Sequence, residues 1–179
     1  MLPVTVARVP REVSLVRASQ ADAALLANLL ELYIHDLSDV FQDVELGADG
    51  RFGYRHLDLY WSEADRGSAF LIRCDGRVSG FALVTRGSPA ASDPQTLDVA
   101  EFFVMRRYRR EGVGRRAAIQ LWEQMPGSWM VRVCEANAGA LKFWTEVVAG
   151  FTNGAYAEAV KSGQPAAWRV FSFESGARR

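Results

Sequence analysis

The stretch E-F-F-V-M-R-R-Y-R-R-E-G-V-G-R-R, residues 101–116, decides how the rest of the chain is interpreted. An apolar strand runs into an arginine-rich loop, and two glycines one residue apart, Gly112 and Gly114, then open a helix. Glycine lets the backbone turn tightly because it has no Cβ. The unpaired N–H groups of a helix's first turn attract anions. The stretch therefore predicts an anion site suited to a diphosphate.

The spacing of these glycines separates the loop from the two common nucleotide-binding motifs. It matches neither the dinucleotide fingerprint G-x-G-x-x-G nor the G-x-x-x-x-G-K of nucleotide hydrolases. Arg109, Arg110 and Arg115 add side-chain charge to the predicted site. A solvated basic surface and a nucleic-acid contact are the alternative interpretations of this cluster.

Outward from this stretch, periodicity predicts a single α+β domain over residues 1–179, because no linker divides it. Strands are expected at residues 14–18, 69–73, 78–85, 96–105 and 129–134, with a β-rich tail over 151–174. Helices are expected at residues 21–37, 52–61 and 112–125, and from an Asn137 cap to about Val148. The predicted order is β-α-α-β-β-β-α-β-α-β-β.

Composition limits the protein class. With 49% apolar residues in 179, the chain can bury a core, which argues against a disordered protein. No run reaches the roughly 18 uncharged apolar residues of a membrane span. The basic residues are 19 Arg and 2 Lys, a usage associated with GC-rich bacterial genomes.

Charge is balanced overall but not along the chain. The 21 basic and 21 acidic residues cancel, which argues against a dedicated nucleic-acid binder. Residues 1–105 carry 15 acidic and 9 basic residues, whereas residues 106–179 carry 6 acidic and 12 basic residues. The balance is thus −6 in the first part and +6 in the second, so ionic ligands remain compatible with zero net charge.

Cysteine and histidine usage favours a metal-free cytoplasmic protein. Cys74 and Cys134 lie at the ends of expected strands and are too few for a secreted disulfide scaffold. Residues 1–11 lack the apolar core of a signal peptide. His35 and His56 show no ligand-like spacing, so we expect no metal.

The R-x-x-G-x-G of residues 109–114, after an apolar strand, resembles the acetyl-CoA motif of the GNAT superfamily of N-acetyltransferases. The block V-R-V-C-E-A-N-A-G-A-L-K-F-W-T-E-V-V-A-G-F, residues 131–151, is similar to the family's later strand, capped helix and closing Gly-Phe. The resemblance spans about residues 95–151. It implies a mixed, mostly antiparallel sheet flanked by helices. The segment D-V-A-E-F-F-V, residues 98–104, is also similar to the sequences of a bacterial subgroup of predicted acetyltransferases.

The resemblance implies how acetyl-CoA binds. The strand at 96–105 should splay from that at 129–134, and pantetheine would lie between them as a false strand. It would bond the backbone of Phe102, Val104 and Arg106. Asn137 would contact the pantetheine arm, with Phe143 and Trp144 beside it. The residues implied to hold the diphosphate are Arg109, Arg110, Glu111, Gly112, Val113, Gly114 and Arg115.

The reaction implied by the family is direct attack of an amine on the acetyl thioester. Glu101 and Asp98 are the candidate bases, with Glu101 favoured, and the Val104 N–H would meet the oxyanion. Three residues apart, the two carboxylates point to opposite faces of a regular strand. At most one should therefore face the cleft unless a bulge intervenes.

Trp144 departs from the family pattern, in which many members place a tyrosine acid for the leaving thiolate. An indole N–H is not a usable acid. Protonation of a leaving thiolate whose thiol pKa is 8.5 is worth only about 2 kcal/mol at pH 7. The absence of a tyrosine acid therefore weakens the mechanism without abolishing it. Water, Tyr108 or Tyr156 are the candidate substitutes. The departure also leaves open an acyl-CoA-binding sensor or pseudoenzyme on the same fold.

The acceptor prediction rests on an acidic stretch between Glu31 and Asp49. It holds six acidic residues and no Lys or Arg. In GNAT proteins the first helices border the acceptor cleft, so a negative rim there would attract a small cationic amine such as a polyamine, an aminoglycoside or a Lys-like amine. A solvated helix end is the alternative interpretation. The oligomeric state is left open, with a homodimer among the options.

Overall fold

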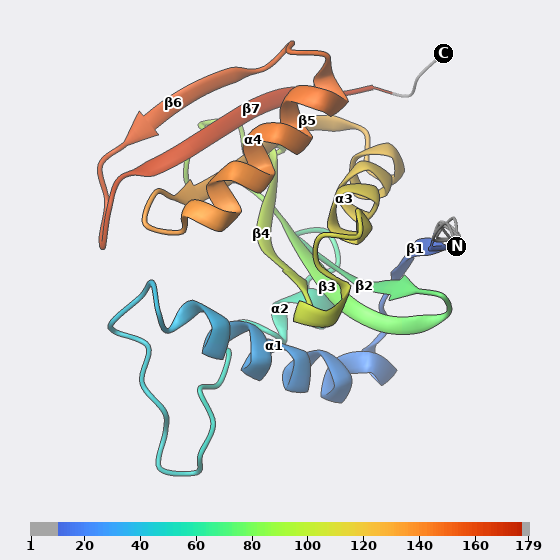
Figure 1. The fold of residues 1–179 in the computed structure, drawn as a ribbon, viewed down its shortest axis with the longest axis vertical. Coiled ribbons are helices and arrows are strands. Elements are labelled where there is room, and N and C mark those ends of the chain that lie inside the picture. The colour runs from blue at the N-terminus through green and yellow to red at the C-terminus, as the bar shows by residue number, and fades with distance from the viewer. Residues whose placement is uncertain (1–10, 177–179) are drawn as a thin grey trace, which may run out of the picture.

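Seven strands form one sheet in the order β1-β2-β3-β4-β5-β7-β6 (Figure 1). The computed structural model describes residues 11–176. Neighbouring strands are antiparallel except β4 and β5, which are parallel. The strands are β1 (Val13–Arg17), β2 (Gly67–Cys74), β3 (Arg77–Arg86), β4 (Leu97–Val104), β5 (Gly127–Cys134), β6 (Ala157–Lys161) and β7 (Trp168–Ser175).

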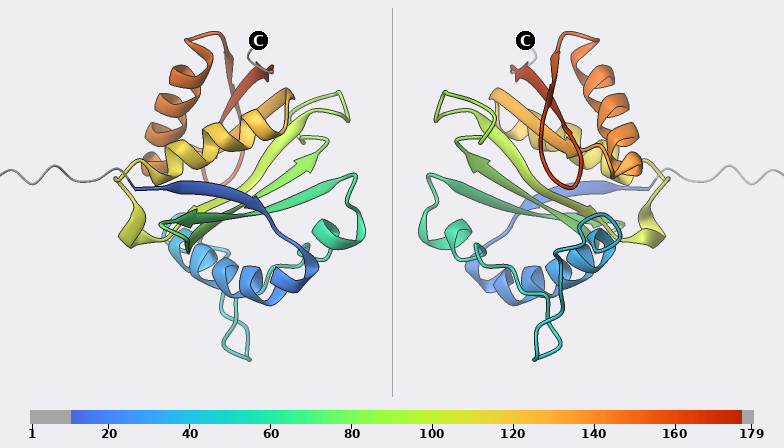
Figure 2. Two further views of the ribbon diagram at one scale, coloured as in Figure 1. Left: turned by 90° about the vertical axis from the view of Figure 1, so that its right-hand side faces the viewer. Right: turned by 90° about the vertical axis from the view of Figure 1, so that its left-hand side faces the viewer.

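Helices cover both faces of the sheet, with α1 on one face and α3 and α4 on the other (Figure 2). The short η2 turn lies between the end of β4 and the start of α3. No helix in the described part of the chain is long and apolar enough to cross a bilayer. The helices are η1 (Gln20–Asp22), α1 (Ala23–Leu37), α2 (Leu59–Ser62), η2 (Arg106–Tyr108), α3 (Val113–Gln124) and α4 (Ala138–Thr152).

Two cores result from this layering, because each face of the sheet buries its own alternating side chains. On the α1 face, Leu26 and Leu30 pack with Phe81 and Phe103. On the other face, α3 and α4 pack with residues of β3, β4, β5 and β7. That larger cluster includes Ala117, Leu121, Trp122, Trp144, Val147, Val131 and Phe171.

The predicted α+β fold and element order are confirmed. The turn at Asp75 and Gly76 between β2 and β3 has φ values of 51° and 74°, and the Asp-Gly pair favours a type I′ hairpin turn with positive φ at both positions. The helix after Asn137 is longer than predicted and ends at Thr152.

The helix predicted over residues 52–61 is wrong in extent, since only Leu59–Ser62 is helical. Gly53 has a φ of +72°, which no helix allows. The N–H groups of Phe52 and Gly53 instead donate to the Glu31 carboxylate at 2.7 and 3.1 Å. Tyr54, Leu57, Tyr60 and Trp61 have the spacing of one helix face, but the tertiary contact with α1 determines the local backbone.

Candidate active site

The strands β4 and β5 separate after only three paired positions, from Leu97 opposite Trp129 to Val99 opposite Val131. The remainder of β4 stays paired with β3 only. Figure 1 shows the two strands diverging toward η2 and the start of α4. The predicted splay is therefore confirmed, and it leaves one edge of β4 without a strand partner.

Backbone groups of Val104 face this edge. The next residue, Met105, donates its N–H to Ser79 of β3 at 2.8 Å. Because successive N–H groups of a strand point to opposite edges, the Val104 and Phe102 N–H groups point toward β5. These are backbone groups expected to pair with pantetheine. Arg109 Nε already occupies the Val104 carbonyl, at 2.6 Å.

A β-bulge lies in the middle of β4. Leu83 of β3 lies opposite Glu101, whereas the next residue, Val84, lies opposite Val99, so Ala100 is the extra residue. The bulge restores Glu101 to the face that Asp98 occupies. The condition attached to the sequence prediction is thus met, and both carboxylates lie on the α1 face of the sheet.

Glu101 is held by two tyrosines from different elements. Tyr33 of α1 donates to Oε2 at 2.7 Å, and Tyr54 donates to Oε1 at 3.2 Å. Burial raises the pKa of Glu101, and the two hydroxyl donors offset part of that rise. Burial likewise raises the pKa of both tyrosines, so they remain protonated donors at neutral pH.

Asp98 has a different partner and no exposed surface. Its Oδ2 accepts a hydrogen bond from Arg132 Nε of β5 at 2.7 Å. Its Oδ1 is buried without a hydrogen-bond partner among the described residues. Asp98 is therefore an ion-pair partner, which leaves Glu101 as the carboxylate with neutral donors only.

The loop before α3 has the backbone that the anion prediction requires. Arg110 and Gly112 have positive φ values of 62° and 75°. The first helical bond is from Arg116 N–H to the Gly112 carbonyl at 3.1 Å. The N–H groups of Val113, Gly114 and Arg115 therefore have no carbonyl partner within the helix.

Gly114 allows the helix to approach α4. A Cβ at this position would lie 3.2 Å from the Phe143 ring and 3.6 Å from Val104. The second glycine of the motif thus leaves room for the Phe143 ring, and the first suits its positive φ. The residues present fit a diphosphate held by backbone donors.

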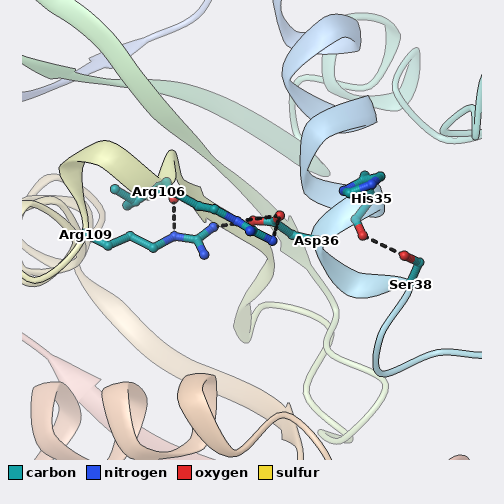
Figure 3. Close-up of polar contacts among 6 residues, drawn as sticks. His35, Asp36, Ser38, Arg106 and Arg109 are labelled. Atoms are coloured by element: carbon teal, nitrogen blue, oxygen red, sulfur yellow. Dashed lines mark hydrogen bonds and ion pairs between the residues drawn. The ribbon is translucent and has the colours of Figure 1, made fainter.

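The Arg109 side chain lies away from these donors. Its Nη2 contacts Asp36 Oδ2 of α1 at 2.5 Å (Figure 3). Arg106 contacts Oδ1 of the same carboxylate at 2.7 Å through Nη2 and 3.1 Å through Nε. Burial opposes ionisation of Asp36, but the hydrogen bonds from both arginines prevail and lower its pKa. Exposed Arg110 remains as a side-chain cation at the loop, whereas the Arg115 guanidinium, expected there from the sequence, lies beside Gly150 of α4.

The aromatic residues of α4 pack against β4. Trp144 is buried, and its ring lies 5.0 Å from Phe102 and 4.9 Å from Phe143. Asn137 caps α4 by accepting from Ala140 N–H at 3.0 Å, which leaves its amide nitrogen as a donor for another contact. Trp144 is thus a core residue. Its neighbour Phe102 lies on the part of β4 that has separated from β5.

The two tyrosines considered as substitute acids lie in different places. Tyr108 is buried in η2, with Arg107 over its ring at 5.1 Å. Tyr156 follows α4 and packs on Phe171, with 5.9 Å between ring centroids. Cys134 is a free, buried thiol.

Fewer acidic side chains of the 31–49 stretch are free to form a negative rim than the sequence predicts. Asp36 is engaged by two arginines, and Glu31 binds the N–H groups of the 52–53 segment and Arg51. Glu31 also lines a pocket of about 460 Å³ beside Tyr54. The other acidic residues, Asp39, Asp43, Glu45 and Asp49, are exposed. Within residues 11–176, no group of three or more His, Cys, Asp or Glu is arranged to hold a metal.

Tyr33, Tyr54 and Arg132 were missed by sequence reasoning. The two tyrosines lie in segments predicted as helices, 21–37 and 52–61, where their rings fit the apolar face of each helix. Buried tyrosines need a partner for the hydroxyl, and this requirement was the available signal. Arg132 is a charge inside the apolar strand W-M-V-R-V-C, which was a second signal.

Comparison with known proteins agrees with this geometry. The family model for the acetyltransferase (GNAT) family matches residues 27–151, more than half of the chain. No curated protein matches the sequence significantly.

Solved structures of similar fold span nearly the whole chain. YncA of Salmonella typhimurium, solved with acetyl-CoA, is 13% identical, with a TM-score of 0.60 over 93% of this chain and 95% of that one. The Escherichia coli ribosomal-protein-S18-alanine N-acetyltransferase is 13% identical, with a TM-score of 0.59 over 94% and 97%. RimL, a ribosomal L7/L12 alpha-N-protein acetyltransferase in complex with coenzyme A, is 12% identical, with a TM-score of 0.63 over 98% of both chains. The chain belongs to the acetyltransferase (GNAT) family.

Proposed function

We propose that this protein is an N-acetyltransferase that moves the acetyl group of acetyl-CoA to a primary amine of a small acceptor. The acceptor reaches the protein as its ammonium cation. The observation that carries the proposal is Glu101: a partly buried carboxylate beside the bulge of β4, held by the Tyr33 and Tyr54 hydroxyls.

Glu101 would act as the general base. Deprotonating an alkylammonium of pKa 10.4 at pH 7 costs about 4.6 kcal/mol, so a base contributes substantially to the rate. A carboxylate whose pKa is raised by burial is a better proton acceptor than an exposed one. The tyrosine hydroxyls keep it oriented, and the exposed acids of the 38–50 loop favour the approach of a cation.

Acetyl-CoA would supply the activated thioester. The Phe102, Val104 and Arg106 backbone would hold its pantetheine arm, with the Val104 N–H directed at the developing oxyanion. Phe143 and the buried Trp144 would form the wall on the α4 side, and the Asn137 amide nitrogen would add a donor. The diphosphate would bind the backbone donors of Arg110, Glu111, Gly112, Val113, Gly114 and Arg115.

Arg109 would serve this site indirectly. Its guanidinium links the Val104 carbonyl to Asp36, so it fixes the end of β4 against α1. The leaving thiolate has no tyrosine at position 144. Departure as the free thiolate costs only about 2 kcal/mol relative to the thiol at pH 7, since the thiol pKa lies about 1.5 units above neutrality, and bulk water would then protonate the thiolate.

Glu101→Gln tests the base. We expect kcat, measured as thiol release from acetyl-CoA with a panel of amines, to fall by about 10²–10⁴-fold, with CoA affinity by calorimetry unchanged. Glu146→Gln, an exposed carboxylate on α4, is the matched control and should keep full activity. A kcat within twofold of wild type in Glu101→Gln would remove Glu101 from the mechanism.

Gly112→Asp tests the diphosphate site. We expect CoA affinity to fall at least about tenfold, because the change strains a positive-φ position and adds a negative charge. Gly154→Asp controls for strain, since Gly154 also has a positive φ of 82° but lies beyond α4. Wild-type protein that binds CoA and acetylates no amine would identify an acyl-CoA-binding protein instead.

A further inference from the structure

Arg132 is a charged residue on the same face of the sheet as Glu101. It is the first residue of β5 after the last β4–β5 pair, Val99 with Val131. Its neighbours Val131 and Val133 pack into the α3–α4 core. Because side chains alternate along a strand, Arg132 points to the opposite face, where Asp98 and Glu101 lie.

Asp98 anchors this arginine at one end only. The fully buried Asp98 accepts from Nε at 2.7 Å, and Arg132 keeps 26% of its side-chain surface exposed. Its two terminal NH₂ groups have no hydrogen-bond acceptor in residues 11–176. An arginine fixed at Nε with free terminal nitrogens is already oriented to bind a carboxylate with both of them.

We propose that Arg132 selects an acceptor that carries a carboxylate in addition to its reactive amine. The inference rests on the proposed acetyl transfer and narrows its substrate class to amino-acid-like molecules. The ammonium of such a zwitterion would approach Glu101, and its carboxylate would pair with the free edge of the Arg132 guanidinium.

The charges on this face fit a zwitterion better than a polycation. Asp98 and Arg132 form one ion pair, and Glu101 is the remaining carboxylate. Arg106 and Arg109, the cations at the far end of β4, are already paired with Asp36. A polyamine would place cationic groups beside Arg132 without an anion to match it, which disfavours that class.

The test compares amines that differ only at the carboxylate. Glycine, β-alanine, 4-aminobutyrate, glutamate and lysine are each assayed beside their carboxamides, with thiol release as the readout. For the best pair, replacing wild type by Arg132→Met should raise KM for the acid about 10- to 100-fold and leave KM for the amide unchanged. Comparing the two proteins cancels the intrinsic difference in amine basicity between acid and amide.

Two further variants distinguish the loss of carboxylate binding from misfolding of Arg132→Met. Arg132→Lys keeps a cation beside Asp98 but lacks the two-pronged donor, so it should lose part of the preference. The double variant Asp98→Asn with Arg132→Met removes both charges and should lose all of it. Arg169→Met is the matched control, because Arg169 is a strand arginine on the opposite face, paired with Glu135 and Glu158. It should retain the wild-type preference.

The experiments distinguish an incorrect role for Arg132 from the absence of acetyl transfer. If amines are acetylated but Arg132→Met keeps the acid preference, or wild type shows none, the role of Arg132 is refuted and the transferase stands. If no amine releases thiol, calorimetry with the CoA-loaded protein still decides. Tighter binding of the amino acids than of their amides, lost in Arg132→Met, supports the inference, and equal or absent binding refutes it.

Discussion

The Asp98–Arg132 pair and the Asp36–Arg106–Arg109 cluster join distant parts of the chain by the same chemistry in opposite surroundings. Asp98 has no exposed side-chain surface and Arg132 has 26%, whereas Arg106 and Arg109 are 72% and 41% exposed. Water can replace an exposed partner but not a buried one. The buried pair should therefore contribute more to stability, and the exposed cluster should chiefly position the end of β4.

The largest effect should come from breaking the buried pair. Arg132→Met leaves the Asp98 charge without a partner in the core, and we expect a loss of about 3–5 kcal/mol in the free energy of unfolding. Urea unfolding at pH 7 measures it. The double variant Asp98→Asn with Arg132→Met should regain most of the loss. An equal loss in single and double variants would contradict this account.

A smaller effect, on the pH dependence of catalysis, is expected at Glu101, whose partly buried carboxylate accepts hydrogen bonds from neutral hydroxyls. Tyr33→Phe removes the 2.7 Å hydrogen bond that stabilises the carboxylate, so the pKa of Glu101 should rise further. The base must be ionised, and the acidic limb of the kcat profile should therefore shift to higher pH. Tyr156→Phe, on the far side of the sheet, should leave the profile in place. An unchanged limb in Tyr33→Phe would show that Glu101 is not the titrating group.

The same carboxylate should also contribute a pH dependence of folding. Burial raises the pKa of Glu101 above its unfolded value, so its contribution favours the folded state at low pH and is lost as pH rises through the folded-state pKa. Glu101→Gln removes this dependence. The difference in unfolding free energy between variant and wild type should grow in favour of the variant from pH 5 to pH 8, and a constant difference would disprove it.

The smallest effect is expected from Asp36→Asn in the exposed cluster. Its loss of unfolding free energy should be a small fraction of that in Arg132→Met, because solvent screens both arginines. KM for acetyl-CoA should rise only slightly, as Arg109 loses one anchor of the β4 end. A loss comparable to that of Arg132→Met would erase the distinction between the two pairs.

The local sequence was sufficient to locate most helices and strands and the glycine loop before α3. Alternation and apolar runs located the strands, and the two glycines located the start of α3, because these signals depend on neighbouring residues. The segment 52–58 was misjudged for the converse reason. Its aromatic spacing suits a helix, but its backbone bonds to Glu31, twenty-one residues earlier in the chain.

The carboxylate on β4 was identified, but not its surroundings. The sequence narrowed the base to Asp98 or Glu101, and the bulge at Ala100 then placed both on one face. Tyr33 and Tyr54 lie 68 and 47 residues from Glu101, and no spacing rule connects them. Asp36, assigned to an open acidic rim, instead binds arginines 70 and 73 residues away.

The sequence by itself determined the α+β architecture, the family resemblance and a glycine loop able to hold a diphosphate. Only the tertiary structure decided which charged side chains pair with one another and which lie where β4 and β5 separate. Charge pairing acts through space and depends on burial, and both are set by how the sheet and helices pack. The opposing charges of the two halves of the chain thus became specific contacts: Asp36 with Arg106 and Arg109, and Asp98 with Arg132.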